Sequence, residues 1–187
     1  MQDQDLRSLS RRGALIGTGL AAWISRPARA EDPESAPPQA GDHLVFLTGS
    51  KKGQTIRSDD LPAGGPQMQA YPADPNGTVR NGSRLNLVIV AHIGDDGVSD
   101  ETRAHMADGV VAYSGICSHQ ACPVSMWSND RHAFVCSCHG SVYDPRNGAE
   151  VLAGPAPRHL AALPLKSENG LLTIAAGFVG RVGMQTS

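Results

Sequence analysis

The chain has few aromatic residues, few cysteines and no long apolar segment. Only 4% of its 187 residues are aromatic, and no stretch approaches the roughly 18 apolar residues that a membrane-spanning helix requires. No long segment shows a helical period and there is no internal repeat, which argues against long amphipathic helices and repeat architectures. Glycine (21 residues) and proline (13) are frequent instead, and this composition indicates a β-rich domain with many loops.

The first 30 residues have the layout of a signal peptide. Arg11 and Arg12 precede an apolar run over residues 13–24, and Ala28-Arg29-Ala30 matches a cleavage site. The arginine pair predicts export of the folded protein by the twin-arginine (Tat) route, cleavage after Ala30 and a periplasmic location. Retention of the run as a membrane anchor is the alternative. Its 12 residues would span only about 18 Å of helix, whereas a bilayer core is about 30 Å thick.

Short segments rich in β-branched and aliphatic residues predict an all-β fold. The predicted strands are residues 43–47, 67–71, 85–93, 109–114 and 131–135, followed by a hairpin of 161–165 and 171–175 around Glu168-Asn169-Gly170. Residues 100–107 could form one or two helical turns.

Two halves of a metal-ligand motif lie between residues 117 and 141. They read Cys117-Ser-His119-Gln-Ala-Cys122 and Cys136-Ser-Cys138-His139-Gly-Ser141, and they contain all four cysteines of the chain. Thiolates and imidazoles suit iron or zinc. A structural zinc site uses four ligands, often as CxxC pairs. This motif offers six candidate groups without that pairing, so iron is favoured over zinc.

The two halves resemble the cluster-binding boxes of disulfide-containing Rieske [2Fe–2S] proteins. The resemblance implies that Cys117 and Cys136 ligate one iron of the cluster and that His119 and His139 ligate the other. Two neutral imidazoles in place of two thiolates make such a centre easier to reduce. Rieske centres have potentials of about −150 to +300 mV, against about −400 mV for all-cysteine plant-type clusters.

The same resemblance assigns further residues around the cluster. Cys122 and Cys138 would form a disulfide between the two cluster loops. Ser141 would donate a hydrogen bond to a bridging sulfide and Tyr143 to a cysteine sulfur, and both donors raise the potential because they stabilise the more negative reduced state. Residues 154–157 (Gly-Pro-Ala-Pro) resemble the proline loop that covers the cluster.

The Rieske resemblance also implies a domain organisation. We expect a flexible leader over residues 31–42, a Rieske domain over 43–180 and a short tail over 181–187. Within the domain, a cluster-binding subdomain of about residues 113–159 would be inserted into a small antiparallel β base.

One-electron transfer is the function that the resemblance implies. The small size and the predicted soluble mature form favour the small subunit of a periplasmic molybdenum oxidoreductase of the arsenite-oxidase type, with a large catalytic subunit and a c-type cytochrome as partners. The alternatives are the Rieske subunit of a quinol–cytochrome c oxidoreductase of the cytochrome bc type, with cytochrome b and quinol as partners, or a free-standing periplasmic carrier. A Rieske oxygenase is excluded, because nothing after Pro157 offers a 2-His-1-carboxylate iron site.

The charge of the chain restricts its partners further. The 11 basic and 16 acidic residues after residue 30 give a formal charge of −5. This balance argues against nucleic acid and is compatible with a basic cytochrome. The five remaining histidines are expected at the surface or in turns, and Met126-Trp127 is expected to be a partly buried loop anchor rather than an exposed docking contact.

Overall fold

The computed structural model describes residues 32–184, so the predicted signal peptide lies outside the described part of the chain. Within the described residues, no helix is both long enough and apolar enough to cross a membrane. The only α-helix in this range is the single turn α1 (Asp100–Arg103), and the prediction of an all-β fold is confirmed. The strands are β1 (His43–Phe46), β2 (Met68–Ala73), β3 (Val88–His92), β4 (Val110–Ser114), β5 (Val124–Ser128), β6 (Ala133–Cys136), β7 (Val142–Asp144), β8 (Glu150–Ala153), β9 (Leu165–Glu168) and β10 (Leu171–Ile174).

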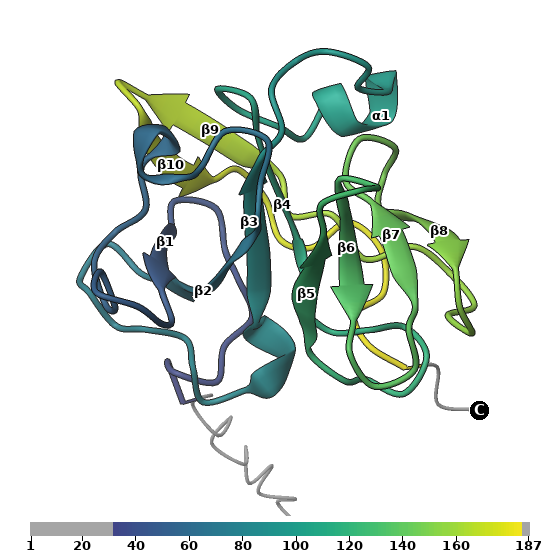
Figure 1. The fold of residues 1–187 in the computed structure, drawn as a ribbon. Helices are drawn as coiled ribbons and strands as arrows, with labels where there is room; N and C mark the ends of the chain where they lie inside the picture. Colours follow the sequence, from purple (N-terminus) through teal and green to yellow (C-terminus); the bar gives the residue numbers. More distant parts are fainter. Residues whose placement is uncertain (1–31, 185–187) are drawn as a thin grey trace, which may run out of the picture. The chain divides into compact units, whose positions relative to one another are not determined.

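The strands form two antiparallel sheets (Figure 1). The larger sheet has the order β4-β3-β2-β1-β10-β9, and the smaller sheet has the order β5-β6-β7-β8. The smaller sheet is built from consecutive strands that lie in the sequence between β4 and β9, two strands of the larger sheet. A subdomain that follows residue 114 and ends before residue 165 is therefore inserted into the base sheet.

Strands β3 and β4 are buried on both faces, which explains why their sequences are apolar up to their last residues, His92 and Ser114. On one face, Val88 and Val90 pack in the core of the base sheet. On the other face, Ile89 and Tyr113 belong to a second core that also contains Phe134 of the inserted subdomain. The candidate ligands Cys117 and Cys136 belong to this second core as well, so the site is supported by the packing between the sheets.

Strand β5 also contacts the base directly. The Trp127 ring packs edge-to-face on Phe134 with 5.7 Å between ring centroids. A Cβ atom on Gly65 would lie 2.4 Å from the Trp127 ring, so only glycine permits this contact. The Gln67 side chain donates to the Met126 carbonyl (2.9 Å). Trp127 is therefore partly buried, as the sequence predicts, but it lies on a strand and not in a loop. Met126 is 52% exposed, so the prediction of a buried anchor is wrong for this residue.

Several strand boundaries differ from the prediction. Residues 84–86 form a short 3-10 turn before β3, because the Ser83 hydroxyl caps it at the Leu85 N–H (3.3 Å). The closing hairpin is β9 and β10, joined by Asn169-Gly170 with φ values of 52° and 79°. Such a two-residue turn sets the register. Glu168 pairs with Leu171, and pairing continues outward to Leu165 and Ile174, so the first hairpin strand starts at Leu165 rather than at residue 161. Residues 161–163 instead run beside β4.

Residues 32–42 are packed onto the base sheet, in contrast to the flexible leader that the sequence predicts. Asp42 is buried and accepts two hydrogen bonds from the buried Arg80 guanidinium, at 2.7 and 3.0 Å. Arg80 also donates to the Pro33 carbonyl (3.2 Å), and the Asn86 side chain donates to the Ala36 carbonyl (2.8 Å). These side chains lie far along the chain from the segment that they bind, and its proline-rich composition does not reveal them.

Candidate metal centre

The first loop of the candidate centre runs from Cys117 to Cys122 and is closed by two backbone hydrogen bonds. The Cys117 N–H donates to the Cys122 carbonyl (2.8 Å), and the Ala121 N–H donates back to the Cys117 carbonyl (3.0 Å). Closing the loop requires a left-handed residue at position 121, where φ is 55°. Alanine occupies this position, although glycine adopts such a conformation at lower cost.

The second loop repeats this geometry between Cys136 and Ser141. The Cys136 N–H donates to the Ser141 carbonyl (2.8 Å), and the Gly140 N–H donates to the Cys136 carbonyl (3.0 Å). Gly140 has φ 71° and corresponds to Ala121 of the first loop. Each loop thus presents a cysteine at its start and a histidine within it, from the same kind of turn.

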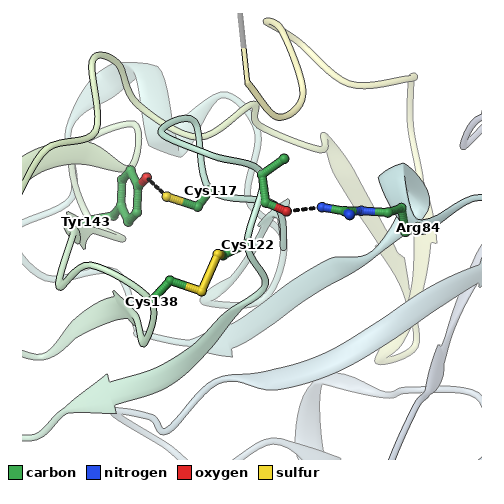
Figure 2. The surroundings of a disulfide bond; sticks show 6 residues. Arg84, Cys117, Cys122, Cys138 and Tyr143 are labelled. Atoms are coloured by element: carbon green, nitrogen blue, oxygen red, sulfur yellow. Dashed lines mark hydrogen bonds between the residues drawn. A yellow bond between two sulfur atoms is a disulfide. The ribbon is translucent and has the colours of Figure 1, made fainter.

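A disulfide joins the two loops. Figure 2 shows the bond between the sulfur atoms of Cys122 and Cys138. The Cα atoms of the two residues are 6.5 Å apart. The predicted disulfide is confirmed. The Cys136 sulfur lies within 4.8 Å of both disulfide sulfurs, so the bond adjoins the free thiol of the second loop.

The two remaining cysteines, Cys117 and Cys136, are free and buried. Burial by itself raises the pKa of the Cys117 thiol, but hydrogen bonds led by that from Tyr143 outweigh it and hold this pKa below its ordinary value. Burial raises the pKa of the Cys136 thiol, and the neighbouring Cys117 raises it further. The surroundings therefore favour the thiolate form of Cys117 more than that of Cys136.

The two histidines lie together at the more exposed side of the site. The rings of His119 and His139 are 4.8 Å apart between centroids and nearly perpendicular (87°). His139 is exposed and His119 is partly buried. The His119 Nδ1 atom is buried and has no hydrogen-bond partner among residues 32–184. A buried nitrogen without a partner is costly unless something binds it, and a metal ion is a suitable partner for Nδ1.

The Tyr143 hydroxyl is directed at the sulfur of the first loop (Figure 2). Its oxygen lies 3.1 Å from the Cys117 Sγ atom and accepts a weaker hydrogen bond from the Ser118 N–H at 3.4 Å. Because a thiolate sulfur carries no hydrogen of its own, the hydroxyl is the donor to Cys117 when that cysteine is ionised. Burial raises the pKa of Tyr143, so the phenol stays protonated and remains a donor.

Ser141 connects the second loop to the proline loop at residues 154–157. Its buried hydroxyl oxygen accepts a hydrogen bond from the Ala156 N–H (3.2 Å), which leaves the hydroxyl hydrogen available to another acceptor. A Cβ atom at Gly154 would lie 2.5 Å from the Ser141 Cα atom, so the two loops are in backbone contact. The proline loop therefore covers the second loop directly.

Two arginines outside the motif, which the sequence did not reveal as site residues, hold the first loop from outside. Arg84 donates to the Ala121 carbonyl, as Figure 2 shows. Arg158 donates to the carbonyls of Arg181 (2.5 Å) and Gly183, while its own carbonyl accepts from the Ser118 hydroxyl (2.6 Å). The acceptors of these arginines are backbone carbonyls, which leave no motif in the sequence.

The predicted site residues thus come together from two similar loops and a covering third loop. Two free buried thiols, two adjacent histidines and an interloop disulfide make up the candidate cysteine–histidine metal centre. The two thiols and the unpartnered His119 Nδ1 atom fit an iron–sulfur cluster with both sulfur and nitrogen ligands.

Comparisons with known proteins identify the family. A family model described as Rieske [2Fe-2S] domain matches residues 67–164. A protein of Haloferax mediterranei named as the Rieske subunit of a respiratory nitrate reductase is 31% identical over 173 residues, which cover 91% of this chain and 74% of that protein. The cytochrome bc1 complex Rieske iron–sulfur subunit of Streptomyces lividans is 33% identical over 98 residues, covering 51% of this chain and 58% of that subunit. Among solved structures, the plasma membrane Rieske protein PetC3 of Synechocystis PCC 6803 matches with a TM-score of 0.39 and 24% identity, covering 59% of this chain and 86% of that one.

The chain belongs to the Rieske [2Fe–2S] family. The cofactor of such a domain is a [2Fe–2S] cluster, and the function that it supports is electron transfer. The two relatives are named as Rieske subunits of a nitrate reductase and of the bc1 complex.

Proposed function

We propose that Cys117 and Cys136 bind one iron of the cluster and that His119 and His139 bind the other. The observation that carries this assignment is the convergence of four suitable groups. Two free buried thiols start the two similar loops, and the two histidine rings lie 4.8 Å apart. When bound, the cluster supplies reversible one-electron exchange.

The surrounding residues would set the reduction potential of this centre and the position of its two loops. The Tyr143 hydroxyl donates to the Cys117 sulfur, and the free hydrogen of the Ser141 hydroxyl is available to a sulfide. The disulfide and the external hydrogen bonds hold both loops in place. His139 is exposed while both cysteines are buried. We call the side of the site that carries His119 and His139 the histidine edge, and it is the shortest route for electrons into and out of the protein.

The ligand assignment can be tested by substitution with a matched control. His139→Ala should abolish the reduced-cluster electron paramagnetic resonance (EPR) signal or replace it with a different one, because the second iron loses a ligand. His159→Ala removes an exposed histidine outside both loops and should leave the signal unchanged. Iron and sulfide analysis of both purified proteins would show two irons in the control. A His139→Ala protein with an unaltered EPR signal and potential would refute the assignment.

We further propose that the protein is exported by the twin-arginine route and is the electron-transfer subunit of a periplasmic molybdenum oxidoreductase of the arsenite-oxidase type. Its support is the signal-like segment over residues 1–30 and the Haloferax relative, an oxidoreductase subunit that aligns over 91% of this chain. The Rieske subunit of a cytochrome bc-type complex is the second candidate. It is favoured by bc1 relatives such as that of Streptomyces lividans, which aligns over 51% of the chain.

Isolation of the native complex would decide between these assignments. The full chain, expressed in its own host with a C-terminal affinity tag, should be recovered from the periplasm with a large subunit, and the purified material should contain molybdenum. Recovery from membranes with b- and c-type haem would support the cytochrome bc assignment instead. Recovery without any partner would support a free-standing carrier. A Lys-Lys replacement of Arg11 and Arg12 should retain the protein in the cytoplasm if the export assignment is correct.

A further inference from the structure

The end of the inserted subdomain that carries the cluster loops has an unusual distribution of charge. Three loops meet there, because residues 117–122 precede β5, residues 137–141 connect β6 to β7, and residues 154–157 follow β8. None of these loop residues is charged. The histidine edge is therefore surrounded by a neutral surface.

Three arginines lie around this neutral surface. Arg84 reaches the first loop at the Ala121 carbonyl, and Arg158 follows the proline loop and binds the Arg181 carbonyl. None of the three forms a salt bridge with a carboxylate within residues 32–184. Their positive charges are therefore not neutralised by the protein itself. We call Arg84, Arg158 and Arg181 the arginine rim.

Acidic residues are absent from the sequence segments that form this end. Residues 81–87, 115–128, 133–143, 151–164 and 171–184 contain no Asp or Glu, and their basic residues apart from histidine are the three of the arginine rim. The exception is Glu34 of the N-terminal segment, which lies beside residues 81–87 because its carbonyl accepts a hydrogen bond from the Gly82 N–H (2.9 Å). The arginine rim is thus a local cluster of positive charge in a chain whose formal charge after residue 30 is −5.

The opposite end of the subdomain is acidic. The turn between β7 and β8 lies beside α1, since the Ser99 N–H donates to the Arg146 carbonyl (2.9 Å) and the Gly148 N–H to the Thr102 hydroxyl (2.7 Å). Acidic side chains outnumber basic ones in and beside these elements, since Arg103 and Arg146 are set against Asp95, Asp96, Asp100, Glu101, Asp144 and Glu150. In Figure 1, α1 is at the top of the view and the C-terminal end of the described chain is near the bottom. A strand of four to five residues separates the two ends by about 15 Å, which exceeds the Debye length of about 8 Å at physiological ionic strength.

We infer that the cluster end docks an electron-transfer partner whose contact surface carries carboxylates around a neutral centre. The arginine rim would attract those carboxylates, while the neutral loops would let the histidine edge approach closely. This inference rests on the proposed site of electron exchange, and it replaces the basic cytochrome that the net charge suggests. Net charge fails as a guide here because docking depends on the charge near the exchange site rather than on the sum over the chain.

Small redox reagents of opposite charge test the inference on the intact, cluster-loaded protein. In stopped-flow experiments, ferricyanide takes one electron from the reduced protein and becomes ferrocyanide, and tris(phenanthroline)cobalt(III) takes one electron and becomes the cobalt(II) complex. The ferricyanide rate should fall as ionic strength rises, and the cobalt rate should rise. Opposite slopes for both reagents would overturn the inference.

Arg181→Gln is the decisive variant, because it removes the charge of the side chain and keeps the backbone carbonyl to which Arg158 donates. A single charge about 8 Å from a trivalent anion should change the ferricyanide rate at low salt by about fivefold. Arg131→Gln, in the turn between β5 and β6 at the far end of the sheet, is the matched control and should change it less than twofold. Equal changes of the ferricyanide rate in the two variants would refute the proposed role of the arginine rim.

A pair of cytochromes extends the test to protein partners. An acidic c-type cytochrome should oxidise the reduced protein faster than a basic one at low salt, and Arg181→Gln should narrow the difference. Faster oxidation by the basic cytochrome would refute the inference. The EPR signal of each variant separates this outcome from failure of the proposed site, because a correctly ligated cluster gives the same signal whatever charge surrounds it.

Discussion

Replacing Tyr143 with phenylalanine should lower the reduction potential without removing the cluster. The phenol oxygen lies 3.1 Å from the Cys117 sulfur, and the hydroxyl is the donor because a cysteine that binds iron is a thiolate without a hydrogen of its own. A donor to a ligand sulfur stabilises the reduced, more negative state more than the oxidised state. The substitution removes that preference and leaves the ring in place.

The size of the shift follows from the strength of one hydrogen bond. A hydrogen bond to a charged group contributes about 1.5–3 kcal/mol, and we take about 1 kcal/mol of it to depend on redox state. Since about 1.4 kcal/mol corresponds to 59 mV for one electron, the potential should fall by about 40 mV. Protein film voltammetry, or a redox titration followed by circular dichroism, resolves such a shift.

Tyr113→Phe is the control for this experiment. Tyr113 is also fully buried, and its hydroxyl donates to the Pro145 carbonyl (3.0 Å) instead of to a sulfur. Burial raises the pKa of Tyr113 to about 12, so it is a protonated donor as Tyr143 is. Each hydroxyl has two hydrogen-bond partners, so both substitutions remove similar buried hydrogen bonds and should destabilise the fold by about 1–2 kcal/mol. Only the Tyr143 substitution should change the potential, and equal shifts in the two variants would refute the proposed role of the hydroxyl.

Three further predictions concern stability. Ala121→Gly should stabilise the protein by about 0.5–1 kcal/mol, because alanine has φ 55° there and a left-handed L-residue is strained; a lower thermal midpoint would contradict this reasoning. Gly154→Ala should destabilise it by about 2–4 kcal/mol, because a new Cβ meets backbone at 2.5 Å, whereas Gly64→Ala, also at positive φ but with nothing within 4 Å, should lose only about 1 kcal/mol. Asp42→Asn should cost about 3 kcal/mol in denaturant unfolding, because it leaves a buried arginine unpaired, while Asp59→Asn, in an exposed ion pair, should cost less than about 1 kcal/mol.

The site residues were predictable because each half of the motif is local, and the disulfide was predictable because the two halves resemble the cluster-binding boxes of disulfide-containing Rieske proteins. Each half spans only six residues, and the spacing of cysteine and histidine within it is set by the closed turn that both loops adopt. Once such a turn forms, the relative positions of Cys136, Cys138 and His139 follow from the sequence alone. The relation between the two loops does not, since it depends on how β4, β5 and β6 pack against the base.

The features that the sequence did not reveal depend on contacts between distant segments. Strands β5 and β7 show no regular alternation of buried and exposed positions, and β8 alternates over only four residues with Leu152 on its exposed side, so no period-2 pattern of apolar residues identifies them. The packing of residues 32–42 depends on Arg80 and Asn86, which bind backbone carbonyls of that segment. Hydrogen bonds from side chains to carbonyls place no demand on the residue type of the acceptor, and a single sequence therefore cannot reveal them.

The two cluster loops have different external supports, and this difference indicates what the disulfide contributes. The first loop is held by Arg84 at the Ala121 carbonyl and by Ser118 at the Arg158 carbonyl. The second loop is held by the proline loop, through Ser141 and the close contact at Gly154. Each loop also closes on itself through its own backbone hydrogen bonds. Neither loop needs the disulfide to keep its own shape, so the role left to the Cys122–Cys138 bond is to fix the position of one loop relative to the other. That relative position determines whether two cysteines and two histidines can reach one cluster.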